Sequence, residues 1–260
     1  MSTWFERFET GHRYSNIVDE FPDRHQFPKF YEAKRIEIIL EPGDMLYIQP
    51  GWYHWVFSEE PDHNTGLNVA INYWYRDNWN ITHLDRDPPI KTTHTIHKSI
   101  DYMNFLNTLG DRKLYCSASN TGCFTLPRVR WRHDDIVKCT DHYLSFNEFY
   151  EKRTSGDHWY MWANADDRLK PYDPKIDPNW ELYKNVNWWV NFGNVNTAMH
   201  YDDTLNLLCQ IAGKKRVVLF PHSEWANLYL INPYPPDFIA YILQSEQQRQ
   251  QIQQGPSHVF

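Results

Sequence analysis

The tripeptide His200-Tyr201-Asp202 carries the side chains with the clearest chemistry in this chain. Side chains of a strand alternate between its two faces, so a strand here would point His200 and Asp202 in the same direction. One imidazole and one carboxylate on one face can hold a single metal ion. A distant second histidine would complete the two-histidine, one-carboxylate set of a non-haem iron site and leave positions open for other ligands. The pair alone is weak evidence, because it occurs by chance in many chains.

The composition limits what can surround such a site. The chain has 260 residues, 41% of them hydrophobic, so it can bury one substantial core. Aromatic residues make up 17%, with 12 Trp, 17 Tyr and 14 Phe, which suits strands around an aromatic-walled interior. The net charge of −7 argues against a basic field that attracts nucleic acid or anionic lipid. We therefore expect a single domain, as all-β barrels of this size commonly form.

Cysteine usage and hydropathy bear on the compartment. The four cysteines form no CxxC pair, which disfavours a structural zinc site. Neither a signal peptide nor an apolar run long enough to span a membrane is evident. We expect an intracellular protein, cytoplasmic or nuclear, with reduced thiols and no membrane partner.

Strands are predicted in two blocks by short β-branched and aromatic runs between turn residues. The first block has expected strands at 35–40, 45–48 and 67–75, and a polar connector follows. The second begins near residue 97 with a helix over 99–109, and Ser145 with Glu148 forms a capping-box signature that opens another short helix. Further strands are expected at 113–117, 123–126, 158–163, 188–192, 197–202, 206–211 and 216–220, and a final helix at 237–254.

Two long motifs together resemble the JmjC/cupin-type 2-oxoglutarate oxygenases. One runs over 197–221 around His200 and Asp202; the other runs over 41–56, from Glu-Pro-Gly-Asp to Trp-Tyr-His-Trp-Val, followed by 69–74. The branch of closest resemblance contains the asparaginyl hydroxylase of hypoxia-inducible factor and the tRNA wybutosine hydroxylase. The resemblance implies a mostly β fold: a double-stranded β-helix (jelly-roll, cupin, JmjC-like) with flanking helices.

The resemblance also assigns roles to individual residues. His200, Asp202 and His54 match the iron ligands. Lys215 matches the lysine that pairs with the distal carboxylate of 2-oxoglutarate, a dianion that needs a fixed cation in an aromatic pocket. Lys214 is its competitor, and strand alternation places it on the opposite face. The other matched co-substrate residues are Thr197, Tyr160, Asn206, Asn72 and Trp74.

The order of the motifs departs from the family, in which the His-x-Asp block comes first. Here His54 precedes His200 by 146 positions. We infer a circular permutation: residues 1–80 form the C-terminal half of the family barrel, 81–96 a connector, and 97–260 the N-terminal half. Exposed loops tolerate such cuts. Half-domains of a tandem array, or two chains that exchange halves in a homodimer, are the alternatives.

The implied activity is that of an oxygenase that uses Fe(II), 2-oxoglutarate and O₂ to hydroxylate a side chain of a protein or peptide. A modified tRNA base is the second candidate substrate, and the acidic net charge weighs against it. A catalytically silent cupin-like binding module is the third hypothesis. It is disfavoured because His54, His200, Asp202 and Lys215 are all intact.

Overall fold

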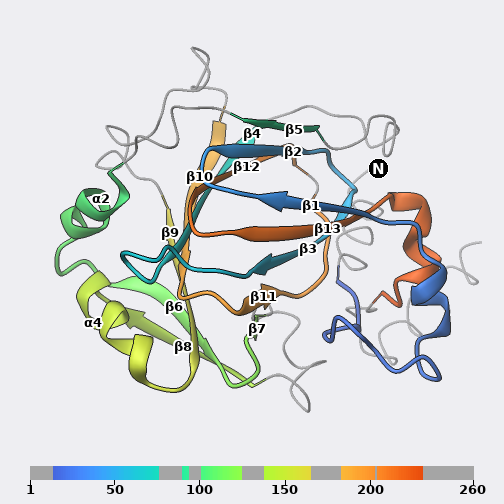
Figure 1. Ribbon diagram of the computed structural model, residues 1–260, viewed down its shortest axis with the longest axis horizontal. Helices are drawn as coiled ribbons and strands as arrows, with labels where there is room; N and C mark the ends of the chain where they lie inside the picture. Colours follow the sequence, from blue (N-terminus) through green and yellow to red (C-terminus); the bar gives the residue numbers. More distant parts are fainter. Residues whose placement is uncertain are drawn as a thin grey trace, which may run out of the picture.

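Two β-sheets form the framework of the protein (Figure 1). The computed structural model describes residues 14–75, 90–93, 101–124, 138–164, 183–202 and 204–230. The five-stranded sheet has the order β1 (Ile36–Leu40), β13 (Lys215–Phe220), β3 (Tyr53–Ser58), β11 (Val195–Thr197) and β7 (Cys123–Phe124). The eight-stranded sheet has the order β5 (Ile90–Thr93), β2 (Asp44–Ile48), β12 (Asn206–Ala212), β4 (Asn68–Tyr75), β10 (Tyr183–Asn191), β9 (His158–Asn164), β6 (Leu114–Ser119) and β8 (Cys139–Leu144). The predicted mostly β, two-sheet fold is confirmed.

Strands from the two ends of the chain alternate in both sheets. In the larger sheet, β2 and β4 flank β12, and β10 lies beyond β4. In the smaller sheet, β1 and β3 flank β13, and β11 lies beyond β3. Strands β1 to β4 therefore do not pair with one another; each pairs with a strand from the second block, and β2 also pairs with β5.

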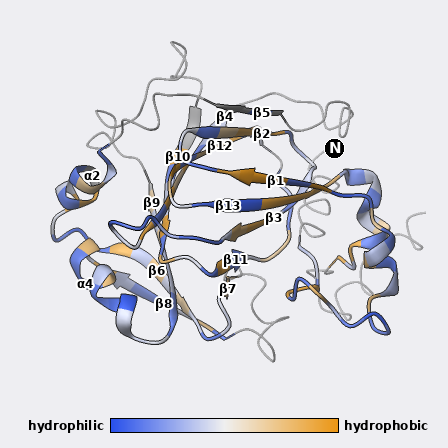
Figure 2. Cartoon of the chain, in the orientation of Figure 1, coloured by the Kyte–Doolittle hydropathy of each residue, from blue (hydrophilic) through white to orange (hydrophobic). Residues whose placement is uncertain are grey.

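The inner faces of the two sheets enclose one of the apolar clusters. It includes Leu46, Ala70 and Leu208 from the larger sheet and Val217 and Leu219 from the smaller one. Because side chains alternate along a strand, the neighbours of these residues face outward. Strand β12 is buried on both faces along its whole length, which explains its nearly continuous apolar run. Strand β13 changes from hydrophilic at its start to hydrophobic at its end (Figure 2).

Short helices cover the outer faces. Helices α2 (Tyr102–Thr108) and α4 (Phe146–Glu151) pack on the eight-stranded sheet. The 3₁₀ helices η1 (Pro28–Glu32) and η8 (His222–Asn227) border the outer face of the five-stranded sheet, and η5 (Lys152–Thr154) continues α4. None of the helices that the structure describes is long and apolar enough to cross a membrane.

The helix boundaries follow from capping. The capping box of α4 is confirmed: Ser145 Oγ accepts from the Glu148 N–H, and Glu148 reaches back to the Ser145 N–H. Helix α2 begins at Tyr102 and not at residue 99, because the Asp101 carboxylate caps it by accepting from the Asn104 N–H at 2.9 Å. The helix predicted over 237–254 lies outside the described residues.

Two other predictions differ from the structure. The connector predicted over 81–96 contains strand β5, which pairs with β2 and is tied to it by an ion pair between Lys91 and Asp44 at 2.7 Å. The strand predicted over Thr197–Asp202 is wrong beyond its first residue. Strand β11 ends at Thr197, and His200 makes only isolated bridges.

Candidate metal centre

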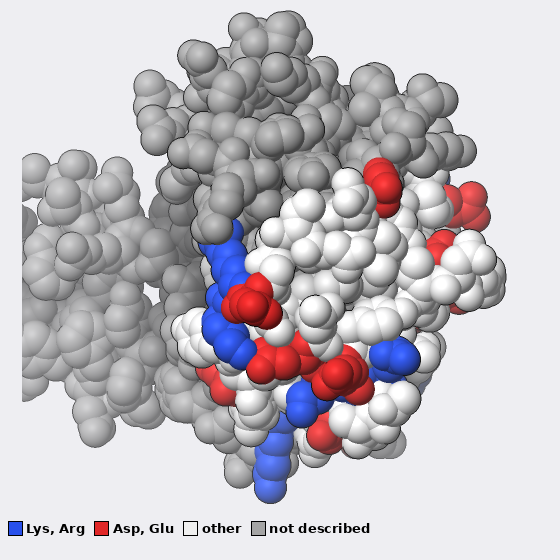
Figure 3. Space-filling model, turned by 90° about the vertical axis from the view of Figure 1, so that its left-hand side faces the viewer, with Lys and Arg blue, Asp and Glu red and all other residues white. Residues whose placement is uncertain are grey.

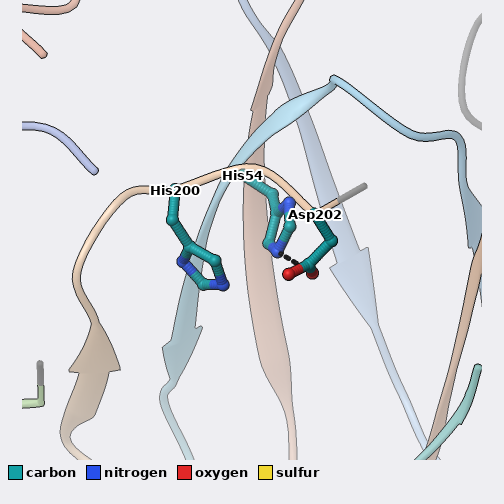
Figure 4. Close-up of side chains that lie close together, drawn as sticks. All are labelled: His54, His200 and Asp202. Atoms are coloured by element: carbon teal, nitrogen blue, oxygen red, sulfur yellow. Dashed lines mark ion pairs between the residues drawn. The ribbon is translucent and has the colours of Figure 1, made fainter. Parts of the chain in front are cut away.

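His54, His200 and Asp202 converge at one end of the space between the sheets. Each offers one ligand atom, and these atoms all lie within 4.8 Å of one another (Figure 4). His54 Nε2 lies 3.3 Å from Asp202 Oδ2, and the two imidazole centroids are 4.4 Å apart. His54 is only 3% exposed, while His200 and Asp202 are partly exposed. The chain thus brings the three predicted ligands together within one subunit.

Backbone hydrogen bonds hold this arrangement. His54 lies on β3, and His200 lies in the connection between β11 and β12. The His54 N–H donates to the His200 carbonyl at 2.7 Å, and the His200 N–H donates to the His54 carbonyl at 3.1 Å. The Gly51 N–H donates to the Asp202 carbonyl at 2.9 Å. The reciprocal pair of hydrogen bonds between His54 and His200 thus positions the ligands, which the predicted strand was expected to do.

Hydrogen bonds also fix which ring nitrogen faces the centre. His54 Nδ1 lies 3.1 Å from the Trp52 carbonyl, and His200 Nδ1 lies 2.7 Å from the Ala198 carbonyl. A carbonyl oxygen can only accept, so each Nδ1 carries the hydrogen and each neutral ring keeps a lone pair on Nε2. The Tyr14 ring stacks on His200 with centroids 5.2 Å apart, which further restrains that ring.

The donor set fits a divalent transition metal. Two imidazole nitrogens and one carboxylate oxygen, grouped on one side, form the facial arrangement typical of non-haem Fe(II) proteins. Carbonyl groups that orient the ligating imidazoles are the usual supporting contacts of such centres. Among the described residues, no further His, Cys, Asp or Glu joins the group. The remaining coordination positions are thereby left to ligands that are not protein side chains.

Lys215 lies at the other end of the same interior. It pairs in register with Ser58, which follows His54 by four residues on the same face of β3. At about 3.3 Å per residue, the Cα atoms of His54 and Ser58 lie on the order of 13 Å apart along the strand. Lys215 is 1% exposed, and burial lowers its pKa to about 7. Its Nζ donates to Ser58 Oγ, and it has no ion pair among the described residues.

Lys214 occupies a different environment. Its Nζ lies 3.3 Å from Glu60 Oε2, and its side chain is partly exposed. Strand alternation therefore separates the two lysines, with Lys215 inside and Lys214 at the surface.

The walls between the two ends carry polar atoms that lack partners. Asn72 donates to Asn206 Oδ1 at 2.7 Å, but Asn72 Oδ1 is buried without a hydrogen bond to any described residue. Thr197 Oγ1 and Trp74 Nε1 are likewise buried without a partner among the described residues. Buried polar atoms without a partner are costly, so these atoms point to a polar ligand or to water between the sheets.

Tyr160 lies on β9 beside β10, with its ring against Phe124 and Trp189. Burial raises the pKa of its phenol, so the hydroxyl stays protonated at neutral pH and can donate a hydrogen bond. Its register partner on β10 is Asn191, whose amide reaches Ser58 at 3.0 Å. Tyr160 thus lies beside Asn191, at the same end of the interior as Lys215.

The sequence analysis missed several interior residues. Ser58 accepts a hydrogen bond from Lys215, and Asn191 donates one to Ser58. Asn187 Oδ1 and Trp162 Nε1 are buried without partners among the described residues. The signal that could have found Ser58 and Asn187 is strand alternation: Ser58 shares a face with His54, and Asn187 is the register partner of Asn72.

The charged side chains on the face with α2 and α4 are mixed in sign (Figure 3). Lys113 pairs with Glu148 there, and Lys214 pairs with Glu60. Among its described residues, this face therefore offers no continuous basic surface of the kind that binds RNA.

Comparison with known proteins places this chain in a family. Residues 5–81 and 132–258 match the family model of a cupin-like domain. A protein of Acanthamoeba polyphaga mimivirus named for a JmjC domain is 27% identical over 242 residues, which cover 82% of this chain and 38% of that protein. A lysine-specific demethylase of Arabidopsis thaliana is 28% identical over 129 residues, covering 49% of this chain and 29% of the relative.

A shorter similarity extends to the tRNA wybutosine-synthesizing protein of Gallus gallus. It is 38% identical over 63 residues, which cover 24% of this chain and 18% of that protein. The chain thus spans well under half the length of these curated relatives. No solved structure matches the chain significantly. The expected kinship with JmjC and cupin proteins is confirmed, and the branch within them stays a prediction. With a cupin-like match over most of its length and JmjC proteins among its relatives, the chain belongs to the cupin-like domain family.

Proposed function

We propose that this domain is an Fe(II)- and 2-oxoglutarate-dependent oxygenase that hydroxylates a side chain of a protein or peptide. The observation that carries the proposal is the pairing of two features in one interior. Two imidazoles and a carboxylate meet within 4.8 Å at one end, and the buried Lys215 lies at the other. JmjC proteins among the relatives, including one named a lysine-specific demethylase, support the same class of chemistry.

The roles of the chain's own residues follow from their positions. His54, His200 and Asp202 would hold the metal, and Lys215 would pair with the distal carboxylate of 2-oxoglutarate. Thr197 and Tyr160 would donate hydroxyl hydrogens toward that carboxylate. Asn72, Asn206 and Trp74 would line the metal end of the pocket.

Iron, when bound, supplies redox chemistry in which O₂ and 2-oxoglutarate yield succinate and CO₂ while a C–H bond of the substrate becomes C–OH. The protein's contribution is to keep one face of the metal open, to orient the co-substrate and to exclude water. No side chain needs to act as a general base in this scheme.

A modified tRNA base is the second candidate substrate. The similarity to the tRNA wybutosine-synthesizing protein favours it, whereas the net charge of −7 and the mixed charges near α2 and α4 favour a protein substrate. Hydroxylation assays with peptide and tRNA pools distinguish the two.

Titration with Mn(II), a redox-stable substitute for Fe(II), tests the metal centre. We expect one ion per wild-type chain, and His200→Ala or Asp202→Ala should weaken binding by at least about 100-fold, because each removes a direct ligand. His25→Ala is the matched control, since His25 is exposed and distant from the centre in sequence. Normal Mn(II) affinity in the His200 and Asp202 variants would contradict the ligand assignment.

Turnover of 2-oxoglutarate tests the enzyme hypothesis. With iron and ascorbate, the wild-type protein should convert 2-oxoglutarate to succinate slowly without substrate, and Asp202→Ala should not. A protein that binds Mn(II) but does not bind 2-oxoglutarate would be the silent binding module.

A further inference from the structure

Ser58 lies where both sheets meet at the lysine end of the interior. Its hydroxyl oxygen accepts from Asn191 Nδ2 at 3.0 Å and also from Lys215 Nζ. The three residues come from β3, β10 and β13, so the contact joins the eight-stranded sheet to the five-stranded one. Exposure is 2% for Ser58, 0% for Asn191 and 1% for Lys215, which places all three out of contact with solvent.

The orientation of the Asn191 amide is determined by a second contact. Asn191 Oδ1 accepts from the Gly193 N–H at 3.0 Å. A backbone N–H can only donate, so the oxygen of the amide must face Gly193 and the nitrogen must face Ser58. Asn191 is therefore a donor to Ser58, and Ser58 is the acceptor.

This fixes what Ser58 can still do. A serine hydroxyl has two acceptor lone pairs and one donor hydrogen. Asn191 and the Lys215 ammonium occupy the two lone pairs, so the hydrogen must point away from both. Among the described residues, nothing accepts that hydrogen. An ammonium has three donor hydrogens and no acceptor, so Lys215 also keeps donors in reserve.

Two buried donors next to each other, one of them cationic and with no acceptor between them among the described residues, fit an anion that has more than one oxygen. We propose that Ser58 is a second direct ligand of the distal carboxylate of 2-oxoglutarate, and that Asn191 is the positioning residue that aims its hydroxyl hydrogen. This inference rests on the proposed function. It adds to Lys215, Thr197 and Tyr160 a donor whose direction is set from the opposite sheet.

The test compares two ligands that differ only at the distal end. 2-Oxobutyrate keeps the keto acid of 2-oxoglutarate but has a hydrogen in place of the distal carboxylate. We consider the ratio of the dissociation constant of 2-oxobutyrate to that of 2-oxoglutarate, both measured calorimetrically on Mn(II)-loaded protein. This ratio reports on the distal site alone. A merely structural change would alter both constants together and leave the ratio unchanged.

Ser58→Ala should lower this ratio by about 10- to 100-fold, the range for a lost hydrogen bond to a charged group, and leave 2-oxobutyrate binding as in wild type. Asn191→Asp should lower the ratio at least as far. The new carboxylate accepts the Ser58 hydrogen, turns it away from the ligand and competes for Lys215. Ser117→Ala is the matched control, because Ser117 is a buried serine on β6 that donates to the Thr140 carbonyl, and its ratio should stay at the wild-type value.

Ser58→Cys provides a second variant of nearly the same volume with a much weaker donor, and it should behave like Ser58→Ala. An unchanged ratio in any folded variant at position 58, or equal losses for both ligands, would overturn the inference while leaving the proposed function intact. Wild-type protein that binds Mn(II) but discriminates poorly between the two ligands would overturn the assignment of the distal site to Lys215 and Ser58 together.

Discussion

Hydrogen bonds to neighbouring residues hold individual side chains at both ends of the interior in fixed orientations. The two imidazoles are oriented by carbonyl acceptors at 2.7 and 3.1 Å, so both present Nε2 to the centre. Lys215 is held by Ser58 in a site where burial lowers its pKa to about 7. A buried ammonium without a counter-ion is unfavourable, so the site gains most from an anion that restores the charge balance.

Lys215 leads to a prediction for the pH dependence of co-substrate affinity. In the empty site its pKa is about 7, so the ammonium is lost above neutral pH, and the bound carboxylate requires the ammonium. The affinity for 2-oxoglutarate should therefore fall by about tenfold per pH unit above pH ~7, with one proton taken up on binding. Calorimetry in buffers of different ionisation enthalpy measures that uptake. Tyr160, at the same end of the interior, stays neutral because burial raises its pKa.

The stability of the empty protein should change in the opposite direction. The pKa of Lys215 is lower in the folded protein than its ordinary value of 10.5, so between about pH 7 and 10 the unfolded chain binds more protons. The free energy of unfolding should therefore rise with pH across this window, and Lys215→Met should remove that rise. Two results would contradict the lowered pKa of Lys215. One is an affinity for 2-oxoglutarate that does not change with pH; the other is a free energy of unfolding that rises with pH as steeply in Lys215→Met as in the wild type.

At the scale of elements, two glycines let the backbone of Glu59–Pro61 approach the sheet connections. Gly193 has φ +80°, and a Cβ there would lie 2.7 Å from the Glu59 carbonyl oxygen. Gly213, in the turn from β12 to β13, has φ +73°, and its Cβ would lie 2.6 Å from the Glu60 carbonyl oxygen. The segment after β3 is thus held against both connections, one residue beyond Ser58.

Gly213→Ala should destabilise the fold through two separate effects. The left-handed φ costs a non-glycine residue about 1–2 kcal/mol, and the close carbonyl adds a steric term that should bring the total to about 3 kcal/mol or more. Gly156→Ala separates the two effects, since Gly156 has φ +87° but nothing within 4 Å of its Cβ. Chemical denaturation measures both, and equal losses in the two variants would exclude the steric contribution.

The elements also show what the sequence could and could not predict. Strands β12 and β13 were located to within one residue, because an apolar run and a turn glycine mark them. The capping box of α4 was recognised because its hydrogen bonds are local. The backbone around His200 was assigned incorrectly, because residues with strand-like spacing form a ladder only if a partner strand continues beside them. Here the partner contacts of His200 are isolated bridges to His54 and Tyr14.

The sequence predicted the candidate metal ligands more fully than the residues at the lysine end of the interior. The resemblance identified His54, His200 and Asp202, which the structure brings together. Ser58 and Asn191 were not found, because serine and asparagine are common in strands and their importance depends on contacts between strands far apart in the chain. Whether the residues matched by resemblance bind metal and co-substrate stays a prediction until the titrations above are done.

At the scale of the whole molecule, the first four strands of the chain form no sheet by themselves, whereas β10, β9, β6 and β8 of the second part pair with one another. Strands β1 to β4 are separated from one another in both sheets by strands from beyond residue 182. This arrangement is what a circular permutation of the family barrel would produce, and we propose that origin for it. Because His54 and the His200 loop meet within one chain, exchange of halves between two chains is not needed to complete the centre.

Separate expression of residues 1–80 and 97–260 tests this interdependence. Residues 1–80 alone should lack strand circular dichroism, because none of the four strands finds its partner there. Mixing the two fragments should restore the strand signal and one Mn(II) site per pair. The edge strand β5 is missing from the mixture, because residues 90–93 belong to neither fragment. A folded 1–80 fragment would show that its strands pair in some other way.

The alternating strands also have a consequence for biosynthesis. As the chain leaves the ribosome, β1 to β4 emerge first. Apart from β2, which pairs with β5, they find no neighbour among the described strands until β10 to β13 have been made, more than one hundred residues later. Such long-range pairing slows folding and leaves apolar strand edges exposed in the meantime. Chaperone dependence during synthesis should therefore be greater for this chain order than for one in which partner strands follow each other closely.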